Sequence, residues 1–77
     1  MGAKAHQRTE RGNLMKVSEA LLDERIVDNT RIIIKTASGR PITAGRWYQD
    51  NILVCGHYDV SSVDFVAEKN MVILQLV

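Results

Sequence analysis

The strongest alternation of apolar and branched side chains lies in residues 30–36, which predict a β-strand. This segment contains three consecutive isoleucines, whose branched Cβ atoms disfavour helix and suit a pleated sheet. Because successive strand side chains point to opposite faces, Arg31, Ile33 and Lys35 should share one face and the other two isoleucines the second.

A tight turn should join this strand to a return strand over residues 41–45. The turn spans residues 37–40 and contains Gly39, which adopts a positive φ without steric cost. Pro41 has no backbone N–H, which suits the first residue of a strand or an edge strand. These two strands are therefore predicted to form an antiparallel hairpin.

Alternation returns in residues 59–67, which predict a third strand. In strict alternation Val63 and Phe65 share one face, and Val60 lies on the other. A hairpin turn should follow, in which Asn70 is able to adopt the left-handed conformation.

The last predicted strand, residues 71–77, is apolar on both of its faces. Two short helices can cover one face of a single sheet well, which leaves the other apolar face to a partner. We therefore expect a homo-oligomer; the alternative is that the helices divide between the two faces. The predicted interface residues are Val72, Leu74, Leu76 and Val77.

Helical spacing of apolar residues appears before each hairpin. Residues 17–25 predict a short helix, with Ser18 as its N-cap and Val17 packed on Leu22 as a hydrophobic staple. Residues 47–55 predict a second short helix, which Gly56 should end.

The expected domain is an α+β domain over residues 15–77, with the order α-β-β-α-β-β and a four-stranded antiparallel sheet. Residues 1–14 have little apolar surface to bury, so a disordered arm is expected there. The alternative is a translated leader, because Glu10-Arg11-Gly12 can be encoded by purine-rich codons. Such codons resemble a ribosome-binding site two codons before Met15.

Composition excludes several classes of protein. Cys55 is the only cysteine of the 77 residues, so no disulfide forms within one chain, and a lone thiol suits a reducing cytoplasm. No apolar stretch approaches the roughly 20 residues that a membrane-spanning helix needs, so no membrane partner is expected. Residues 1–14 carry a charge balance of +2 and residues 15–77 a balance of −1, so the predicted domain is not basic overall.

Three carboxylates, Asp23, Glu24 and Asp28, cluster around the end of the first predicted helix. Carboxylate oxygens hold Mg²⁺ in metal-dependent phosphodiester cleavage. Asp28 is the candidate metal ligand and catalytic residue, since a helix-to-strand junction holds a carboxylate more rigidly than a helix face. The alternative is a solvated helix end with Asp28 in a turn. Mg²⁺ is the expected cofactor if the protein is a nuclease.

Cationic side chains lie on or beside the first hairpin, with Trp47 close in sequence. Cations and aromatic rings together bind the backbone and stack the bases of nucleic acids. The candidate nucleic-acid-binding residues are Arg31, Lys35, Arg40 and Arg46. The alternative is an ordinary exposed face beside a core tryptophan. For Cys55 and His57, a buried structural cysteine is favoured over a Cys–His nucleophile.

The chain resembles small uncharacterised proteins of phages and mobile elements in Gram-positive gut bacteria. The resemblance is carried by Met15-Lys16-Val17-Ser18-Glu19, by residues 29–35 and by residues 45–53. Among such proteins is an anti-CRISPR type with a PC4-like single-stranded-DNA-binding fold, which is oligomeric and nicks supercoiled DNA. The resemblance implies a DNA-acting accessory protein with a role against host defence.

Two classes of function follow. The first is a mobile-element protein that acts on DNA, as an anti-CRISPR with metal-dependent nicking at Asp28. The second is a non-catalytic interaction module that docks on a partner, such as a host defence protein, through an edge of its sheet.

Overall fold

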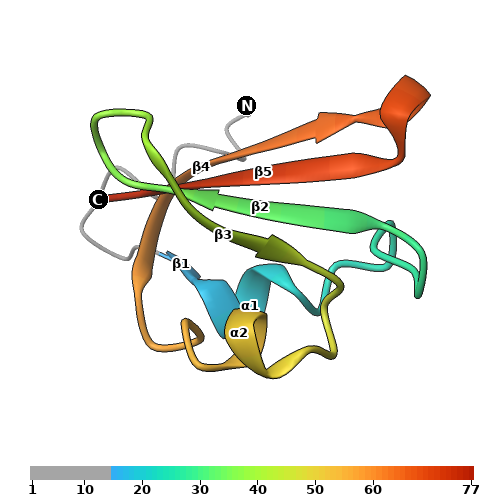
Figure 1. Ribbon diagram of the computed structural model, residues 1–77, viewed down its shortest axis with the longest axis horizontal. Helices are drawn as coiled ribbons and strands as arrows, with labels where there is room; N and C mark the ends of the chain where they lie inside the picture. Colours follow the sequence, from blue (N-terminus) through green and yellow to red (C-terminus); the bar gives the residue numbers. More distant parts are fainter. Residues whose placement is uncertain (1–14) are drawn as a thin grey trace, which may run out of the picture.

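A mixed five-stranded sheet is the framework of residues 15–77, the part of the chain that the computed structural model describes (Figure 1). The elements are β1 (Met15–Lys16), α1 (Val17–Ala20), β2 (Arg31–Lys35), β3 (Pro41–Gly45), α2 (Asp50–Leu53), β4 (Asp59–Val66), the 3₁₀ turn η2 (Ala67–Lys69) and β5 (Met71–Leu76). The strand order is β1-β4-β5-β2-β3. The α+β class with two short helices is confirmed, and the predictions for residues 1–14 lie outside the described residues.

The predicted all-antiparallel, four-stranded sheet is corrected by the way the two hairpins meet. Each hairpin is antiparallel, as predicted, but β2 and β5 pair in parallel, with Ile32 opposite Val72 and Ile34 opposite Leu74. The physical reason is burial: the parallel pair brings the two most apolar strands together in the middle of the sheet, where Ile32, Ile34, Val72 and Leu74 share one core. The fifth strand is β1, which extends the sheet beyond β4.

Hydrogen bonds fix the start of the parallel pair. The N–H of Arg31 donates to the carbonyl of Asn70 at 2.9 Å. The Thr30 side chain is buried, accepts from the N–H of Val27 at 3.0 Å and lies 3.3 Å from Oδ1 of Asn70. Asn70 adopts the predicted left-handed conformation, with φ of 50°. These contacts hold the turn after β4 against the start of β2.

The core lies on one face of the sheet, because both helices cover the same side (Figure 1). This arrangement excludes the alternative in which the helices divide between the faces. Ile32 and Ile34 point into the core, as predicted, and the helices contribute buried side chains such as Val17 and Ile52. The opposite face carries half-buried apolar residues, including Ile33, and is open in the described chain.

Three of the four predicted interface residues belong to this core. Val72, Leu74 and Leu76 are 1%, 0% and 8% exposed within a single chain, while Val77 is exposed. The side chains of the first three face the helices, so they have no surface to offer a second subunit. A partner that covers β5 must therefore use its other face.

The first helix is shorter than predicted, and its N-cap lies two residues earlier. Lys16 is its N-cap in place of Ser18, and the carboxylate of Glu19 accepts the Lys16 N–H at 2.7 Å. The predicted staple is also wrong, because Leu22 is 82% exposed. The helix ends before Leu22 because the carboxylate of Asp23 binds a backbone N–H of the next turn.

The second helix is also shorter than predicted, since α2 covers only Asp50–Leu53. Gly56 does not adopt the left-handed conformation; among the glycines of residues 15–77 only Gly39 has a positive φ. Gly56 instead allows a close approach, because a Cβ there would lie 3.3 Å from the Cβ of Ser18. None of the helices in residues 15–77 has the length and apolar character to cross a membrane.

A bulge in β4 changes the predicted alternation. Val60 pairs with Leu76 and Ser62 with Gln75, so Ser61 is an additional residue without a partner on β5. The bulge turns Val60 toward the core, where it is 1% exposed, on the same face as Val63. The prediction that these two valines face opposite ways is therefore wrong.

Two substitutions on β2 test which face of the sheet is the core. Ile34→Ala should lower the free energy of unfolding by about 2–5 kcal/mol, because Ile34 is 0% exposed. Ile33→Ala should cost clearly less, since its side chain lies on the open face. Urea unfolding measures both. An equal or larger loss for Ile33→Ala would contradict the assignment of the core face.

Candidate functional site

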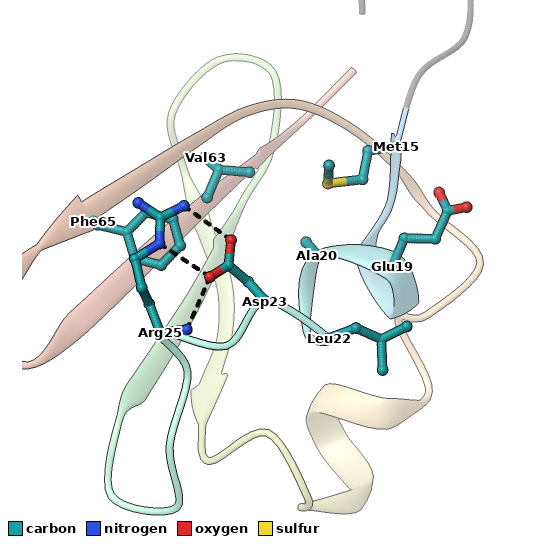
Figure 2. Close-up of a pocket in the computed structure, with 8 residues that line it drawn as sticks. All are labelled: Met15, Glu19, Ala20, Leu22, Asp23, Arg25, Val63 and Phe65. Carbon is teal, nitrogen blue, oxygen red and sulfur yellow. Dashed lines mark hydrogen bonds and ion pairs between the residues drawn. The ribbon is translucent and has the colours of Figure 1, made fainter. Parts of the chain in front are cut away.

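A shallow groove lies between β4 and the segment that follows α1 (Figure 2). Its volume is about 440 Å³. The lining comes from β1, from α1 and the residues after it, and from β4. Lining residues include Met15, Ala20, Leu22, Arg25, Val63 and Phe65. The groove therefore combines apolar contacts with the charged side chains of Glu19, Asp23 and Arg25 beside the edge of the sheet.

The outer edge of β4 runs beside this groove and is largely unpaired in the described chain. β1 covers only two of its positions, with Met15 opposite Val60 and Lys16 opposite Asp59. β1 ends at Lys16, where the N–H of Val17 donates to the carbonyl of Tyr58 at 2.9 Å and α1 turns the chain under the sheet. Because the pair is antiparallel, residues 61–66 of β4 lie beyond Met15, on the side from which the chain enters β1. No strand within residues 15–77 pairs with this side of residues 61–66.

The opposite edge of the sheet, β3, is protected in two ways. Pro41 begins the strand and has no N–H to offer. The side-chain amide of Asn51 in α2 donates to the carbonyl of Ala44 and to the hydroxyl of Thr43, both at 2.9 Å. Among residues 15–77, β4 is therefore the edge whose backbone groups have no described partner.

An ion pair shapes one wall of the groove. Oδ1 of Asp23 accepts the backbone N–H of Arg25 at 2.9 Å and its Nε–H at 3.0 Å, while Oδ2 accepts Nη2 at 2.9 Å. The guanidinium then lies over the ring of Phe65, 3.7 Å from the ring centroid (Figure 2). This cation–π contact holds the segment after α1 beside β4.

The side-chain hydrogen bond from Arg25, together with its backbone N–H, lowers the pKa of Asp23 from 3.8 to about 2. Both hydrogen bonds favour the ionised carboxylate, which explains why the pKa of Asp23 is lowered. The ion pair is therefore present throughout the neutral pH range.

Two of the three predicted carboxylates bind neighbouring side chains. Asp23, Glu24 and Asp28 line one depression beside Trp47, but Asp23 is bound to Arg25 and Oδ1 of Asp28 accepts the indole N–H of Trp47 at 3.2 Å. Within residues 15–77 no three His, Cys, Asp or Glu side chains come together as potential ligands of one ion. The geometry thus assigns Asp28 to a contact that holds Trp47.

The four predicted nucleic-acid-binding residues lie along the β2–β3 hairpin. Arg31 and Lys35 are on the open face of β2, on either side of Ile33, while Arg40 and Arg46 flank the two ends of β3. Neither of the ion pairs found in residues 15–77 involves any of the four. Their charges are therefore not neutralised by an acidic side chain of the described domain.

The cysteine and histidine pair has no catalytic geometry. Cys55 is buried, and its thiol donates to the carbonyl of Asn51 at 3.6 Å. Burial raises the pKa of this thiol, which disfavours the nucleophilic thiolate. His57 instead packs on Tyr58, with 4.4 Å between ring centroids. This supports the structural interpretation of the cysteine.

The groove was not predicted from the sequence. The Asp23–Arg25 turn is a local signal, but its partner Phe65 lies on β4, far away in the chain. The short β1 gives no periodic pattern, since it has only two residues. Predicting an unpaired β4 edge beside a groove therefore requires the strand order, which these local patterns do not give.

The titration of Asp23 tests the geometry of the groove wall. The carboxyl carbon of Asp23, followed by NMR, should titrate near pH 2, and Arg25→Gln should return its midpoint toward 3.8. Because this pKa is lowered on folding, its contribution to stability should be lost as the pH falls from about 4 to about 2. A midpoint near 4 in the unmodified chain would contradict the ion pair.

Comparison with known proteins gives no relative: no protein-family model, no curated protein and no solved structure matches this chain. The resemblance to phage and anti-CRISPR proteins therefore stays a prediction, and the argument about function depends on the geometry of residues 15–77.

Proposed function

We propose that this protein is a non-catalytic interaction module that binds an extended segment of a partner along the β4 edge. The observation that carries the proposal is the pairing of β4, whose outer edge is covered within residues 15–77 only at Val60 and Asp59, by β1. An added strand gains main-chain hydrogen bonds from such an edge, while pockets beside it select alternate side chains.

The groove defines which side chains an added strand should carry. Val63 and Phe65 are half-buried and line the groove, and Met15 and Leu22 at its rim are 37% and 82% exposed. Removing this apolar surface from water favours binding by roughly 25 cal/mol per Å². We therefore expect a partner segment with apolar residues at every second position, on the side that faces the groove.

The charged residues of the groove leave one negative charge. Asp23 and Arg25 neutralise each other, whereas Glu19 accepts the backbone N–H of Lys16 and keeps its charge. The partner is therefore expected to combine alternating apolar side chains with no acidic residue beside Glu19. A host defence protein, the partner class that the phage resemblance implies, would meet this requirement through an exposed extended segment.

A random-peptide display selection against the full chain tests the docking edge. Selected peptides should show apolar residues at alternate positions, and Leu22→Glu should weaken their binding about tenfold, because it places a charge at the rim of the groove. Leu22 is 82% exposed, so the variant should fold normally. Val54→Glu is the matched control, since Val54 is 65% exposed and lies outside the groove.

NMR chemical-shift changes on addition of a selected peptide locate the site. They should concentrate on β4 and on the segment after α1. A selection that yields no peptide, or peptides whose shifts map to the open face of the sheet, would contradict the proposal.

A second proposal is contact with the phosphate backbone of DNA through the open face of the sheet. It is supported by Arg31 and Lys35, which share that face and form no ion pair with the described residues. This proposal concerns binding alone, and metal-dependent nicking at Asp28 stays a prediction.

Salt dependence tests this second proposal. Each phosphate contact of a single strand contributes about 0.7 to the slope of log affinity against log salt concentration. The double variant Arg31→Gln/Lys35→Gln should therefore lower that slope by about 1.4 and weaken binding to a single-stranded oligonucleotide. Lys69→Gln in η2 is the control. Binding that is absent, or equally strong in the double variant, would refute DNA contact through this face.

A further inference from the structure

We infer that the depression beside Trp47 binds an arginine side chain of a partner polypeptide. The depression has a volume of about 400 Å³ and lies between the segment after α1, the residue Trp47 and the end of α2. None of the described residues that line it belongs to β4, so the inference goes beyond the docking edge and is independent of it.

The floor of this Trp47 depression is apolar. Leu21, Ile26 and Trp47 are half-buried and pack against the core, and Leu53 of α2 is 48% exposed. The aliphatic stem of a long side chain would remove this surface from water, which favours binding. The floor alone would accept any apolar group, so the choice of partner depends on the rim.

The rim of the Trp47 depression is acidic. Asp23, Glu24 and Asp28 line it, and none of the described lining residues is Lys, Arg or His. Arg25 neutralises Asp23 through their ion pair. Neither of the ion pairs found in residues 15–77 includes Glu24 or Asp28, so the rim keeps two negative charges and is complementary to a cationic partner.

Two contacts hold the ring of Trp47 at this rim. Its indole N–H donates to Oδ1 of Asp28 at 3.2 Å, and the ring meets Tyr48 edge to face, with 5.6 Å between ring centroids. Indole is the aromatic ring that attracts cations most strongly across its face. A carboxylate and an indole in direct contact therefore offer a cation two kinds of attraction at one place.

These features select arginine among cationic groups. Its planar guanidinium stacks on aromatic rings and donates several N–H groups to carboxylate oxygens, whereas the lysine ammonium is a compact and strongly hydrated charge. In the inferred complex the guanidinium lies beside Trp47 and donates to the carboxylate of Glu24 and to Oδ2 of Asp28. A nucleic acid would be repelled by the same rim, so a polypeptide is the expected source of the arginine.

Fluorescence gives a direct test, because Trp47 is the only tryptophan of the chain. An acetylated and amidated peptide, Gly-Leu-Arg-Leu-Gly, should change the Trp47 emission of the full chain saturably. Its dissociation constant should lie in the millimolar range and rise with salt concentration. The same peptide with glutamine in place of arginine should bind about tenfold more weakly, since it loses both the carboxylate and the indole contacts.

Two charge-neutralising variants test the rim. Glu24→Gln and Asp28→Asn should each weaken binding of the arginine peptide about threefold. Asparagine keeps an oxygen that can accept the indole N–H, so Asp28→Asn removes the charge without releasing Trp47. Glu68→Gln in η2 is the matched control, because it removes the same charge outside the depression and should leave the affinity unchanged.

Three results would overturn the inference. They are an emission of Trp47 that the arginine peptide does not change saturably, equal binding of the arginine and glutamine peptides, and an equal effect of Glu24→Gln and Glu68→Gln. Each of them would leave the β4 docking edge untouched, because that proposal is tested by the display selection and by shift changes on β4.

Other occupants of the Trp47 depression would give different results. If the unliganded full chain sediments as a dimer that Glu24→Gln dissociates, a second copy occupies the depression. If the triple variant Lys4→Gln/Arg8→Gln/Arg11→Gln binds the arginine peptide about tenfold more tightly, basic residues of the chain's own first fourteen compete for it. Either result would overturn the assignment to a partner polypeptide.

Discussion

The parallel pairing of β2 with β5 is the constraint on which the rest of the structure depends. It runs from Arg31 opposite Met71 to Lys35 opposite Gln75, and it begins at the hydrogen bond from Arg31 to Asn70. The pairing places the two most apolar strands in the middle of the sheet. The two antiparallel hairpins are thereby joined through β2 and β5 within one sheet. Their other strands, β3 and β4, therefore lie toward the two edges of the sheet.

The two edges then acquire different properties from short segments nearby. Asn51 of α2 and Pro41 protect β3, whereas within residues 15–77 β1 pairs with β4 only at Asp59 and Val60. The segment after α1 is held beside β4 by the stacking of Arg25 on Phe65.

Local patterns predicted the local structure well. The limits of β2 and β3, the buried face of the isoleucines and the left-handed Asn70 follow from side-chain alternation and turn chemistry. The parallel pairing was missed because alternation describes one strand and not its neighbour, although the doubly apolar β5 carried the signal of a central strand. The groove was missed because Arg25 and Phe65 meet only once the strand order is known, and the bulge at Ser61 reversed one predicted face.

The most direct test of the central claim is amide hydrogen exchange measured residue by residue. The strand order predicts slow exchange at every amide of β2 and β5, whose neighbours pair on both sides, and fast exchange at alternate amides of β4 beyond Ser61 under dilute conditions. The opposite pattern would contradict the account: uniform protection along β4 with alternate fast amides in β5 would place β5 at the edge and remove the free strand.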